Sequence, residues 1–445
     1  MSNMVEIALT TLGCAKNQVD SDIMTKLLAE QGYRKTDDFQ DAEVIIVNTC
    51  GFISDAKEES IETILQLAQY KEEGDCELLV VTGCLAQGYS EELKEEMPEI
   101  DVMLGTGNFD QIVKAVETGL AGERNIEIAE PDFDYDNYVA ETTISNQKSA
   151  YVKIAEGCNN NCSYCLIPKL RGDLKSRSIE QILTEVEQLA AKGVEEINVI
   201  AQDITQYGID LYGESQLVPL LKKLVKVDGI KWIRLLYAYP LHISDELIEL
   251  MAEEDKICNY LDVPVQHADQ EIRTKMNRPG SKEEILAVIN KLRTRVPGIT
   301  LRTSIIVGFP GETVEHFQTL LDFIAEAEFD NLGAFTYSRE ERTPAAEMDC
   351  QIPEDRKEER YEKVMDLQSE ISYRRNCQWV GEEVEVLIED YQSQEPRIMI
   401  GRSQREAPEE IDGAIFVKDT TADKGDFITV EITEAHEYDL IGVEA

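Results

Sequence analysis

Three cysteines fall within eight consecutive positions near the middle of this chain, and they constrain its fold more than any other feature. Cys158, Cys162 and Cys165, the central trio, lie on a polar loop that begins at Gly157. The loop follows residues 151–155, whose alternating side chains predict a β-strand. Open and barrel α/β folds place their chemistry at the carboxyl ends of strands, so we expect a functional site here. Glycine and asparagine tolerate the left-handed backbone that such a loop needs.

The central trio predicts an iron–sulfur cluster with one open coordination position. A 4Fe–4S cluster normally takes four cysteines, so three thiolates leave one iron free to bind a substrate or cofactor. A zinc site is the alternative interpretation. Zinc ligands usually come as paired knuckles far apart in sequence, and the sequence has no second knuckle or histidine partner here.

Three short apolar runs in the N-terminal third each lead to one cysteine. The runs are residues 5–9, 43–47 and 78–81. The cysteines, the N-terminal trio, are Cys14, Cys50 and Cys84. Their spacings, 50 − 14 = 36 and 84 − 50 = 34, are close to a βαβ unit of about 30 residues. Helical patterns at 21–31 and 54–70 separate the runs, so a parallel sheet would bring all three cysteines to one carboxyl edge.

The N-terminal trio predicts a second cluster with an open iron. Buried structural cysteines are the alternative, since they are common in apolar strands. Each member ends its strand instead of lying within it, which favours the cluster. The remaining cysteines show no comparable pattern and are expected to be bystanders. They are Cys76, Cys258, Cys350 and Cys377.

Strand and helix patterns alternate through the middle of the chain. Expected strands are 151–155, 196–200, 232–237, 260–263, 301–307 and 333–336, and expected helices are 179–192, 219–225, 245–252, 282–295 and 315–327. Six such units predict a partial (β/α)6 barrel. Polar residues at strand ends are the candidate site residues. They are Gln202, Asp203, Gln266, His267, Arg302 and the loop 308–312.

The C-terminal part predicts a long charged helix at 353–375 and then a small antiparallel β-barrel. The expected barrel strands are 383–388, 397–401, 414–418 and 427–432. Its only basic residues are Arg397, Arg402, Arg405, Lys418 and Lys424. Because acidic residues outnumber them, this barrel is poorly suited to RNA and better suited to a basic protein. The expected α/β domains are 1–122 and 144–375, with a linker at 123–143 and the β-barrel at 376–445.

The charge of the chain is strongly negative. It carries 43 basic and 88 acidic residues, a formal net charge of −45. Such a surface repels phosphate backbones and favours a cationic partner, although solubility alone is an equally good explanation. The first residues lack the pattern of a signal peptide, and no apolar run is long enough to span a bilayer. We therefore expect a reduced, cytoplasmic and monomeric protein without membrane contact.

The spacing Cys-x3-Cys-x2-Cys, with Tyr164 before the last cysteine, resembles the radical S-adenosylmethionine (SAM) signature. The resemblance implies that the open iron chelates the amino and carboxyl groups of SAM, and that one electron cleaves it to a 5′-deoxyadenosyl radical. A barrel suits such chemistry because its walls exclude water. The candidate SAM contacts are Tyr164, Gln202, Asp203, Gln266 and Arg302.

Essentially the whole chain resembles the methylthiotransferases, and in particular the branch that modifies an aspartate of small-subunit ribosomal protein twelve. The stretches that carry this resemblance are LGCAKNQVDS at 12–21, QDITQYG at 202–208, WIRLLY at 232–237 and PVQHA at 264–268. Two departures, Ala15 in place of a frequent proline and Arg342 in place of a usual glycine, affect loop shape but no cysteine.

The family resemblance implies two 4Fe–4S clusters with separate tasks. The central trio would hold the cluster that binds and cleaves SAM, and the N-terminal trio an auxiliary cluster whose free iron carries the sulfur. One SAM would methylate that sulfur, and a second would supply the radical that removes hydrogen from the aspartate β-carbon. A low-potential donor such as flavodoxin or ferredoxin would supply the electron.

Two other functions are compatible with part of this pattern. A tRNA-adenosine methylthiotransferase shares all six cysteines, but it should carry a basic C-terminal barrel, whereas this barrel is acidic. A non-catalytic iron–sulfur electron carrier has little use for open iron positions or for a barrel-sized second domain.

Overall fold

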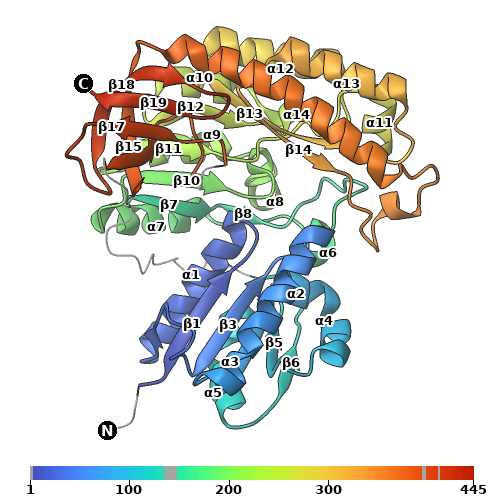
Figure 1. Ribbon diagram of the computed structural model, residues 1–445, viewed down its shortest axis with the longest axis vertical. Helices are drawn as coiled ribbons and strands as arrows, with labels where there is room; N and C mark the ends of the chain where they lie inside the picture. The colour runs from blue at the N-terminus through green and yellow to red at the C-terminus, as the bar shows by residue number, and fades with distance from the viewer. Residues whose placement is uncertain (1–3, 134, 136–147, 393–396, 409–410) are drawn as a thin grey trace.

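Two parallel β-sheets, one small barrel and one short two-stranded antiparallel sheet account for the described strands of the computed structural model. The structure describes residues 4–133, 135, 148–392, 397–408 and 411–445. The N-terminal sheet and its helices occupy one end of the molecule, and the second sheet and the barrel lie together at the other (Figure 1). The fold class predicted from the sequence is confirmed.

The N-terminal sheet is entirely parallel, in the order β2-β1-β3-β4-β5-β6. Its strands are β1 (Glu6–Thr11), β2 (Arg34–Lys35), β3 (Val44–Thr49), β4 (Leu78–Gly83), β5 (Val102–Leu104) and β6 (Asn125–Glu127). Its helices are α1 (Ala15–Glu30), α2 (Ser54–Ala68), α3 (Tyr70–Glu73), α4 (Cys84–Glu96) and α5 (Ile112–Leu120). Every residue of β3 and β4 is buried, which explains their continuous apolar runs. α1 and α5 pack in one hydrophobic cluster of this sheet, and α2 and α4 in another.

Two boundaries in this region differ from the sequence prediction. Helix α1 begins at Ala15 instead of residue 21, because its first turns bury polar side chains and therefore lack an apolar period. Strand β6 lies beyond residue 122, where the linker was expected to begin, and pairs in parallel with β5. Strand β6 has only three residues, which are too few to show an alternating pattern. Residues 134 and 136–147 of the expected linker lie outside the described residues.

The second sheet is an open parallel sheet in the order β14-β13-β12-β11-β10-β7, as a partial barrel requires. Its strands are β7 (Ser149–Lys153), β10 (Glu196–Ile200), β11 (Trp232–Leu235), β12 (Ile257–Asp262), β13 (Thr300–Val307) and β14 (Asn331–Thr336). Its long helices are α7 (Ile179–Ala191), α9 (Leu217–Leu224), α10 (Asp245–Glu253), α12 (Lys282–Arg295) and α13 (Val314–Ala327). Shorter elements between them are β8 (Ala155–Glu156), α6 (Ile167–Arg171), β9 (Lys175–Ser176), α8 (Ile209–Tyr212) and α11 (Gln270–Lys275).

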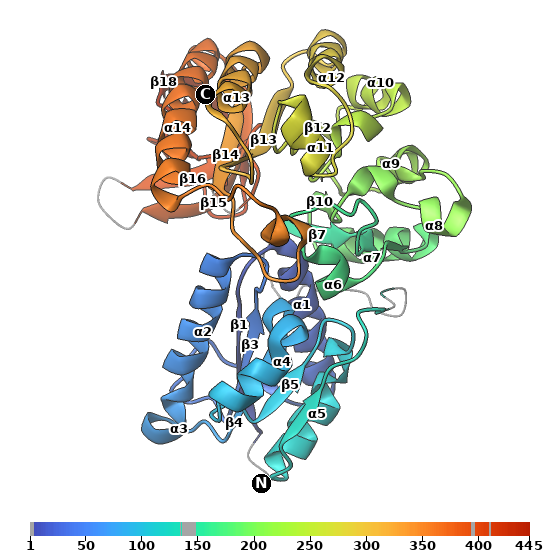
Figure 2. The same ribbon diagram turned by 90° about the vertical axis from the view of Figure 1, so that its right-hand side faces the viewer.

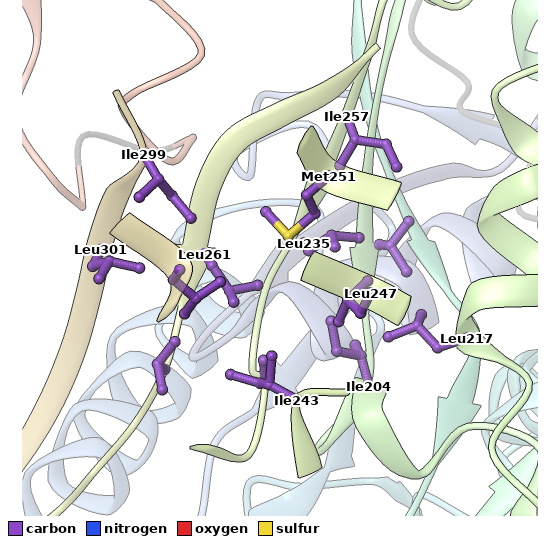
Figure 3. Packing of buried hydrophobic residues seen from close by; sticks show 14 of the residues in the cluster. Ile204, Leu217, Leu235, Ile243, Leu247, Met251, Ile257, Leu261, Ile299 and Leu301 are labelled. Atoms are coloured by element: carbon purple, nitrogen blue, oxygen red, sulfur yellow. The ribbon is translucent and has the colours of Figure 1, made fainter. Parts of the chain in front are cut away.

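The core of this domain lies between the strands and the surrounding helices. Figure 3 shows Leu235 and Leu261 of neighbouring strands facing Leu247 and Met251 of α10. Burying one such aliphatic side chain contributes on the order of 1.5–3 kcal/mol. This core holds the strand ends, and therefore the loops that follow them, in fixed positions.

The C-terminal part consists of the long helix α14 (Glu354–Asn376) and a closed five-stranded barrel. The barrel strands are β15 (Glu383–Gln392), β16 (Ile398–Arg402), β17 (Ile415–Lys418), β18 (Phe427–Ala435) and β19 (Leu440–Glu444). The sequence did not predict β19, whose alternation is interrupted by Gly442. Figure 2 shows α14 beside α13. The barrel packs against the second sheet, where Arg402 pairs with Glu196 of β10 and the Phe427 ring contacts Trp232 of β11. Among the described helices, none is both long and apolar enough to cross a bilayer.

Candidate active site

The N-terminal trio lies at one edge of the first sheet. Cys14 is the N-cap of α1, Cys50 directly follows β3, and Cys84 is the first residue of α4. The preceding strands β1, β3 and β4 are adjacent and parallel, so their carboxyl ends meet. Burial raises the pKa of Cys50, and the nearby thiols of Cys84 and Cys14 raise it further. The three cysteines therefore lie at one carboxyl edge of the sheet, as predicted, and their binding of one cluster stays a prediction.

Gly13 allows the loops of this trio to approach closely. Its φ of 91° lies in the left-handed region, and a Cβ at this position would stand 2.7 Å from Cys50 Cβ and 2.9 Å from Cys50 Sγ. The Asn17 side chain supports the same packing, because its Nδ2 donates to the carbonyls of Leu12 at 2.7 Å and Thr49 at 3.1 Å. A side chain larger than hydrogen at position 13 would push two cysteines apart.

The central trio lies on the loop between β8 and α6. Gly157 and Asn161 have φ values of 74° and 49°, the left-handed backbone expected for this loop. The backbone N–H of Asn160 donates to Cys158 Sγ at 3.5 Å, and that of Ile167 donates to Cys165 Sγ at 3.4 Å. These sulfurs therefore already accept hydrogen bonds, which stabilise thiolates and cluster ligands.

The segment after α11 anchors this loop from outside. Ser163 donates from its N–H to the carbonyl of Met276 at 3.0 Å and from its hydroxyl to the carbonyl of Lys275 at 2.8 Å. Arg278 Nη1 donates to Cys162 Sγ at 3.6 Å, and its Nη2 to the carbonyl of Pro264 at 2.6 Å. Arg278 thus connects the trio to the segment that follows β12.

Both trios fit iron–sulfur clusters. All six cysteines are free, and burial raises the pKa of Cys50 and of Cys165 to about 12 and that of Cys158 to about 11. Metal binding would displace these protons. Within the part of the chain that the structure describes, no three His, Cys, Asp or Glu side chains gather closely enough to hold one metal ion. Cysteines of a cluster bind separate irons and therefore stand further apart.

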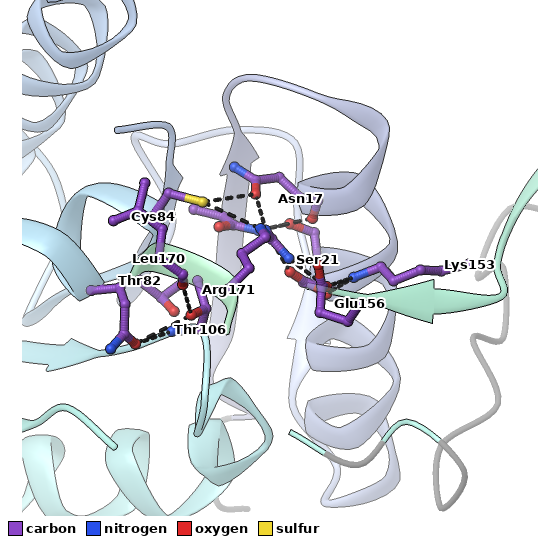
Figure 4. Close-up of polar contacts among 12 residues, drawn as sticks. Asn17, Ser21, Thr82, Cys84, Thr106, Lys153, Glu156, Leu170 and Arg171 are labelled. Carbon is purple, nitrogen blue, oxygen red and sulfur yellow. Dashed lines mark hydrogen bonds and ion pairs between the residues drawn. The ribbon is translucent and has the colours of Figure 1, made fainter. Parts of the chain in front are cut away.

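A buried network of charges joins the two α/β domains beside the trios (Figure 4). Arg171 donates to Glu156 Oε2 at 2.6 Å, to Asp20 Oδ2 at 3.0 Å and, through Nε, to Cys84 Sγ at 3.4 Å. Lys153 Nζ lies 2.6 Å from Asp20 and 2.7 Å from Glu156. Arg171 and Lys153 hold the pKa of Glu156 far below its usual value despite burial. The network fixes the N-terminal domain, through α1, against β7 and β8.

The residues predicted as SAM contacts divide into two groups, and Gln202 and Asp203 form the first. The Gln202 amide donates to Glu156, and its own oxygen is buried with no partner among the described residues. Asp203 accepts from Asn160 Nδ2 at 2.9 Å and from Gln206 Nε2 at 3.1 Å. Asp203 therefore supports the loop of the central trio directly.

The second group lies on or beside β12 and β13. Gln266 has a left-handed φ of 71° and bridges to Ile305 through its backbone, and Tyr164 packs against a small apolar cluster near Cys162. Arg302 pairs with Asp262 at 3.1 Å and with Asp412 of the C-terminal part at 3.0 Å. The sequence did not suggest this bridging role. Contact of all five residues with SAM stays a prediction.

His267 is fully buried, and its Nε2 lies 3.8 Å from Glu312 Oε2. Its Nδ1 accepts a hydrogen bond from the backbone N–H of Asp269 at 3.0 Å, at the start of α11. Burial, together with the nearby charges of His316, Arg273 and Arg360, lowers its pKa to about 3. This is the local structural role that a lone histidine often plays.

Sequence reasoning missed the four charged residues that organise the site. Glu156, Arg171 and Arg278 were not singled out, and Lys16 was quoted only as part of a motif. Charged residues at 153 and 156 of an otherwise apolar strand were a usable signal, because buried charges are costly unless paired. Lys16 is 6% exposed, its ammonium lies 3.0 Å from the centre of the Tyr237 ring, and burial lowers its pKa to about 8.

Comparison with protein families divides the chain in the same order as the fold. Residues 6–105 match the uncharacterized protein family UPF0004, residues 152–324 the radical SAM superfamily, and residues 380–444 the TRAM domain. The fold and the cysteine loop therefore define a radical SAM protein with an additional N-terminal α/β domain and a C-terminal TRAM barrel. Curated relatives cover almost the full length. That from Heliobacterium modesticaldum is 51% identical over 438 residues, 98% of this chain and 95% of the relative.

Two further relatives match this chain over nearly its full length. That from Desulforamulus reducens is 51% identical over 441 residues, and that from Geobacter sulfurreducens 48% over 444 residues, each covering 99% of both chains. All three are named ribosomal protein uS12 methylthiotransferase RimO, and this chain belongs to that family.

Solved structures share the fold at low sequence identity. The radical SAM methyltransferase TsrM from Kitasatospora setae, with cobalamin and a [4Fe-4S] cluster bound, aligns with a TM-score of 0.58 and 16% identity over 77% of each chain. The cobalamin-dependent SAM radical enzyme OxsB aligns with a TM-score of 0.50 and 13% identity over 83% of this chain and 56% of that one. At these identities the likeness concerns the fold alone.

Proposed function

We propose that this chain is a radical SAM enzyme that attaches a methylthio group to the β-carbon of an aspartate in ribosomal protein uS12. The proposal rests on two relatives named ribosomal protein uS12 methylthiotransferase, which are 51% identical to this chain over nearly its full length. The two separate cysteine trios support it. The enzyme acts in the cytoplasm as a monomer, and a low-potential protein such as flavodoxin or ferredoxin supplies the electron.

Each trio holds one 4Fe–4S cluster by three cysteines. When bound, the cluster of the central trio and its SAM supply a carbon-centred radical, and that of the N-terminal trio supplies a coordination position for the transferred sulfur. Backbone N–H groups and Arg278 stabilise the sulfurs of the central trio, and Arg171 stabilises the sulfur of Cys84 in the N-terminal trio. The N-terminal α/β domain, which includes β6, the second α/β domain and the C-terminal barrel divide the work of sulfur carriage, radical formation and substrate docking.

The interdomain network keeps the two trios in a constant relation. Breaking a buried ion pair by removing one partner typically costs about 3–5 kcal/mol, so Arg171, Asp20 and Glu156 resist separation of the domains. The carbon radical formed on the substrate must come within contact distance of the sulfur carried at the N-terminal trio. A rigid arrangement of the two domains keeps these two groups close together. Tyr135 joins the same network through a hydrogen bond of 2.7 Å to Asp20.

The C-terminal barrel supports a basic protein as the substrate. Arg402 is buried between Glu196 and Glu389, and Arg405 is buried against Trp379. These two cations are therefore buried in contacts within the molecule and are not available to bind RNA. On the barrel surface, Arg397 pairs with Asp423 and Lys418 with Glu434. Lys424 adds little to offset the acidic surroundings, which repel RNA and attract a cationic ribosomal protein.

Mass spectrometry of both candidate substrates tests the proposal. Anaerobically reconstituted protein is incubated with SAM, a reductant, uS12 and total tRNA, and both products are digested. We expect a methylthio group on one aspartate of uS12 and unmodified tRNA. A variant in which Ala replaces Cys158, Cys162 and Cys165 is the control and should modify neither. Modification of tRNA alone, or of neither substrate by the native protein, contradicts the proposal.

A further inference from the structure

Lys16 is a buried cation beside the N-terminal trio. It lies two residues after Cys14, in the first turn of α1, and its side chain points toward the second sheet, against Tyr237, which follows β11. The first turn of α1 contains no acidic residue. The amino end of a helix carries partial positive charge, so a lysine there is in an unfavourable position unless an anion is close.

No carboxylate of the described residues pairs with Lys16. The Lys16 ammonium makes no hydrogen bond or ion pair with any of them, and its close contact is the ring of Tyr237. Three acidic groups influence it electrostatically, first the thiol of Cys14 and then the carboxylates of Glu156 and Asp262. Cys14 belongs to the N-terminal trio and would be held by the cluster. Both carboxylates are already paired with other cations, Glu156 with Arg171 at 2.6 Å and Asp262 with Arg302 at 3.1 Å. The ammonium therefore contacts the Tyr237 ring but has no hydrogen-bond acceptor among the described residues.

We propose that Lys16 binds the side-chain carboxylate of the aspartate that is to be modified. This inference rests on the proposed function and assigns a residue to substrate recognition. In aspartate the reacting β-carbon is bonded directly to the carboxylate carbon, so a cation that holds the carboxylate also positions the reacting carbon. Because Lys16 contacts both domains, that carbon lies where the sulfur-carrying and radical-forming parts of the site meet. An adenosine has no carboxylate, so the same contact also selects against tRNA.

SAM also carries a carboxylate, but the position of Lys16 favours the substrate. Lys16 belongs to the domain of the N-terminal trio and follows Cys14, whereas the resemblance assigns SAM to the central trio. The experiment must therefore separate the two carboxylates.

Binding of matched substrates without turnover tests the proposal. Affinity for uS12, and for uS12 with asparagine at the target aspartate, is measured on cluster-loaded protein with SAM and no reductant. We expect the native protein to prefer aspartate by about tenfold or more, the contribution of one charge-assisted hydrogen bond. Lys16→Met should abolish the preference, while Lys16→Arg retains part of it. Lys26→Met, the same change on the same helix, should leave it intact.

Two controls distinguish a local from a general effect. Iron content and SAM affinity of Lys16→Met should equal those of the native protein, and Lys16→Gln serves if the methionine variant does not fold. Loss of SAM affinity with an intact aspartate preference would assign Lys16 to SAM and overturn the proposal, as would an unchanged preference in both variants. If the native protein modifies no uS12, the proposed function fails. If it modifies uS12 with no preference that depends on Lys16, only this inference fails.

Discussion

The two cysteine trios are brought together in different ways. The central trio lies within eight positions of one loop, and local backbone N–H groups donate to two of its sulfurs. The N-terminal trio comes from three βα connections and is assembled only when β1, β3 and β4 pair. A site on one loop depends on local conformation, whereas a site across a sheet depends on the whole domain.

The trios also differ in how an arginine reaches them. Arg278 approaches Cys162 from within the same domain, after α11, whereas Arg171 approaches Cys84 from the other domain. Arg171 therefore donates a hydrogen bond to a sulfur of the N-terminal trio and also belongs to the interdomain network. We conclude that the N-terminal trio depends on the docking of the two domains and the central trio does not. Four predictions test this difference.

Removal of one trio at a time should have the largest effect. Replacing Cys14, Cys50 and Cys84 by Ala should remove about half of the bound iron and abolish methylthio transfer, while reductive SAM cleavage to 5′-deoxyadenosine survives. The same change in the central trio should abolish SAM cleavage and leave the other half of the iron. Iron analysis and chromatography of the nucleoside check this. Replacing buried Cys76 should change neither, and loss of all iron from either triple variant contradicts separate sites.

Loss of Arg171 should be the next largest effect. Arg171→Met leaves Glu156 and Asp20 short of a buried cation, which should lower the free energy of unfolding by about 3–5 kcal/mol. Iron at the N-terminal trio should be lost more readily than iron at the central trio. Urea unfolding of the metal-free protein and iron analysis after chelation measure the two effects. Arg124→Met, on the surface, is the control, and equal iron loss from both sites would show that the domain interface does not matter.

Gly13 offers a smaller and more local test. Gly13→Ala should disturb the N-terminal trio, because the new Cβ would overlap Cys50, and iron at that site should fall with SAM cleavage unaffected. Gly32→Ala is a matched control, since Gly32 has a similar φ of 89° and no atoms within 4 Å of the added Cβ. That control should cost only about 1 kcal/mol in unfolding free energy. Equal iron contents in the two variants would refute the close-packing argument.

The smallest expected effect concerns His267, which supports the start of α11 and so the anchor of the central trio. Its folded pKa of about 3 lies below the value of 6.5 for an unfolded histidine. Unfolding therefore takes up a proton below pH 6.5, and the stability contributed above that pH is lost as the pH falls toward 3, by up to about 1.4 kcal/mol per unit. His267→Asn should reduce this slope in urea titrations between pH 7.5 and 5.5. An unchanged slope would mean that His267 is protonated in the folded protein.

Much of the architecture could be predicted because it depends on local patterns. β10 and α12 have the predicted boundaries, since apolar alternation in the strand and the capping box of Ser281 and Glu284 are encoded nearby. β6 and β19 were missed because a short strand or an interrupted pattern carries too little signal. Helix α1 began earlier than predicted because its buried first turns are polar.

The sequence by itself determined which residues are the candidate cluster ligands: six cysteines, three on one loop and three at strand ends, with spacings that favour iron–sulfur clusters. Only the tertiary structure decided which charges surround them. Asn17 and Arg171 meet across 154 positions, and Lys16 faces a tyrosine of another domain. Such contacts follow no periodic pattern, because a buried charge is stabilised by whichever partner the packed domains bring within reach.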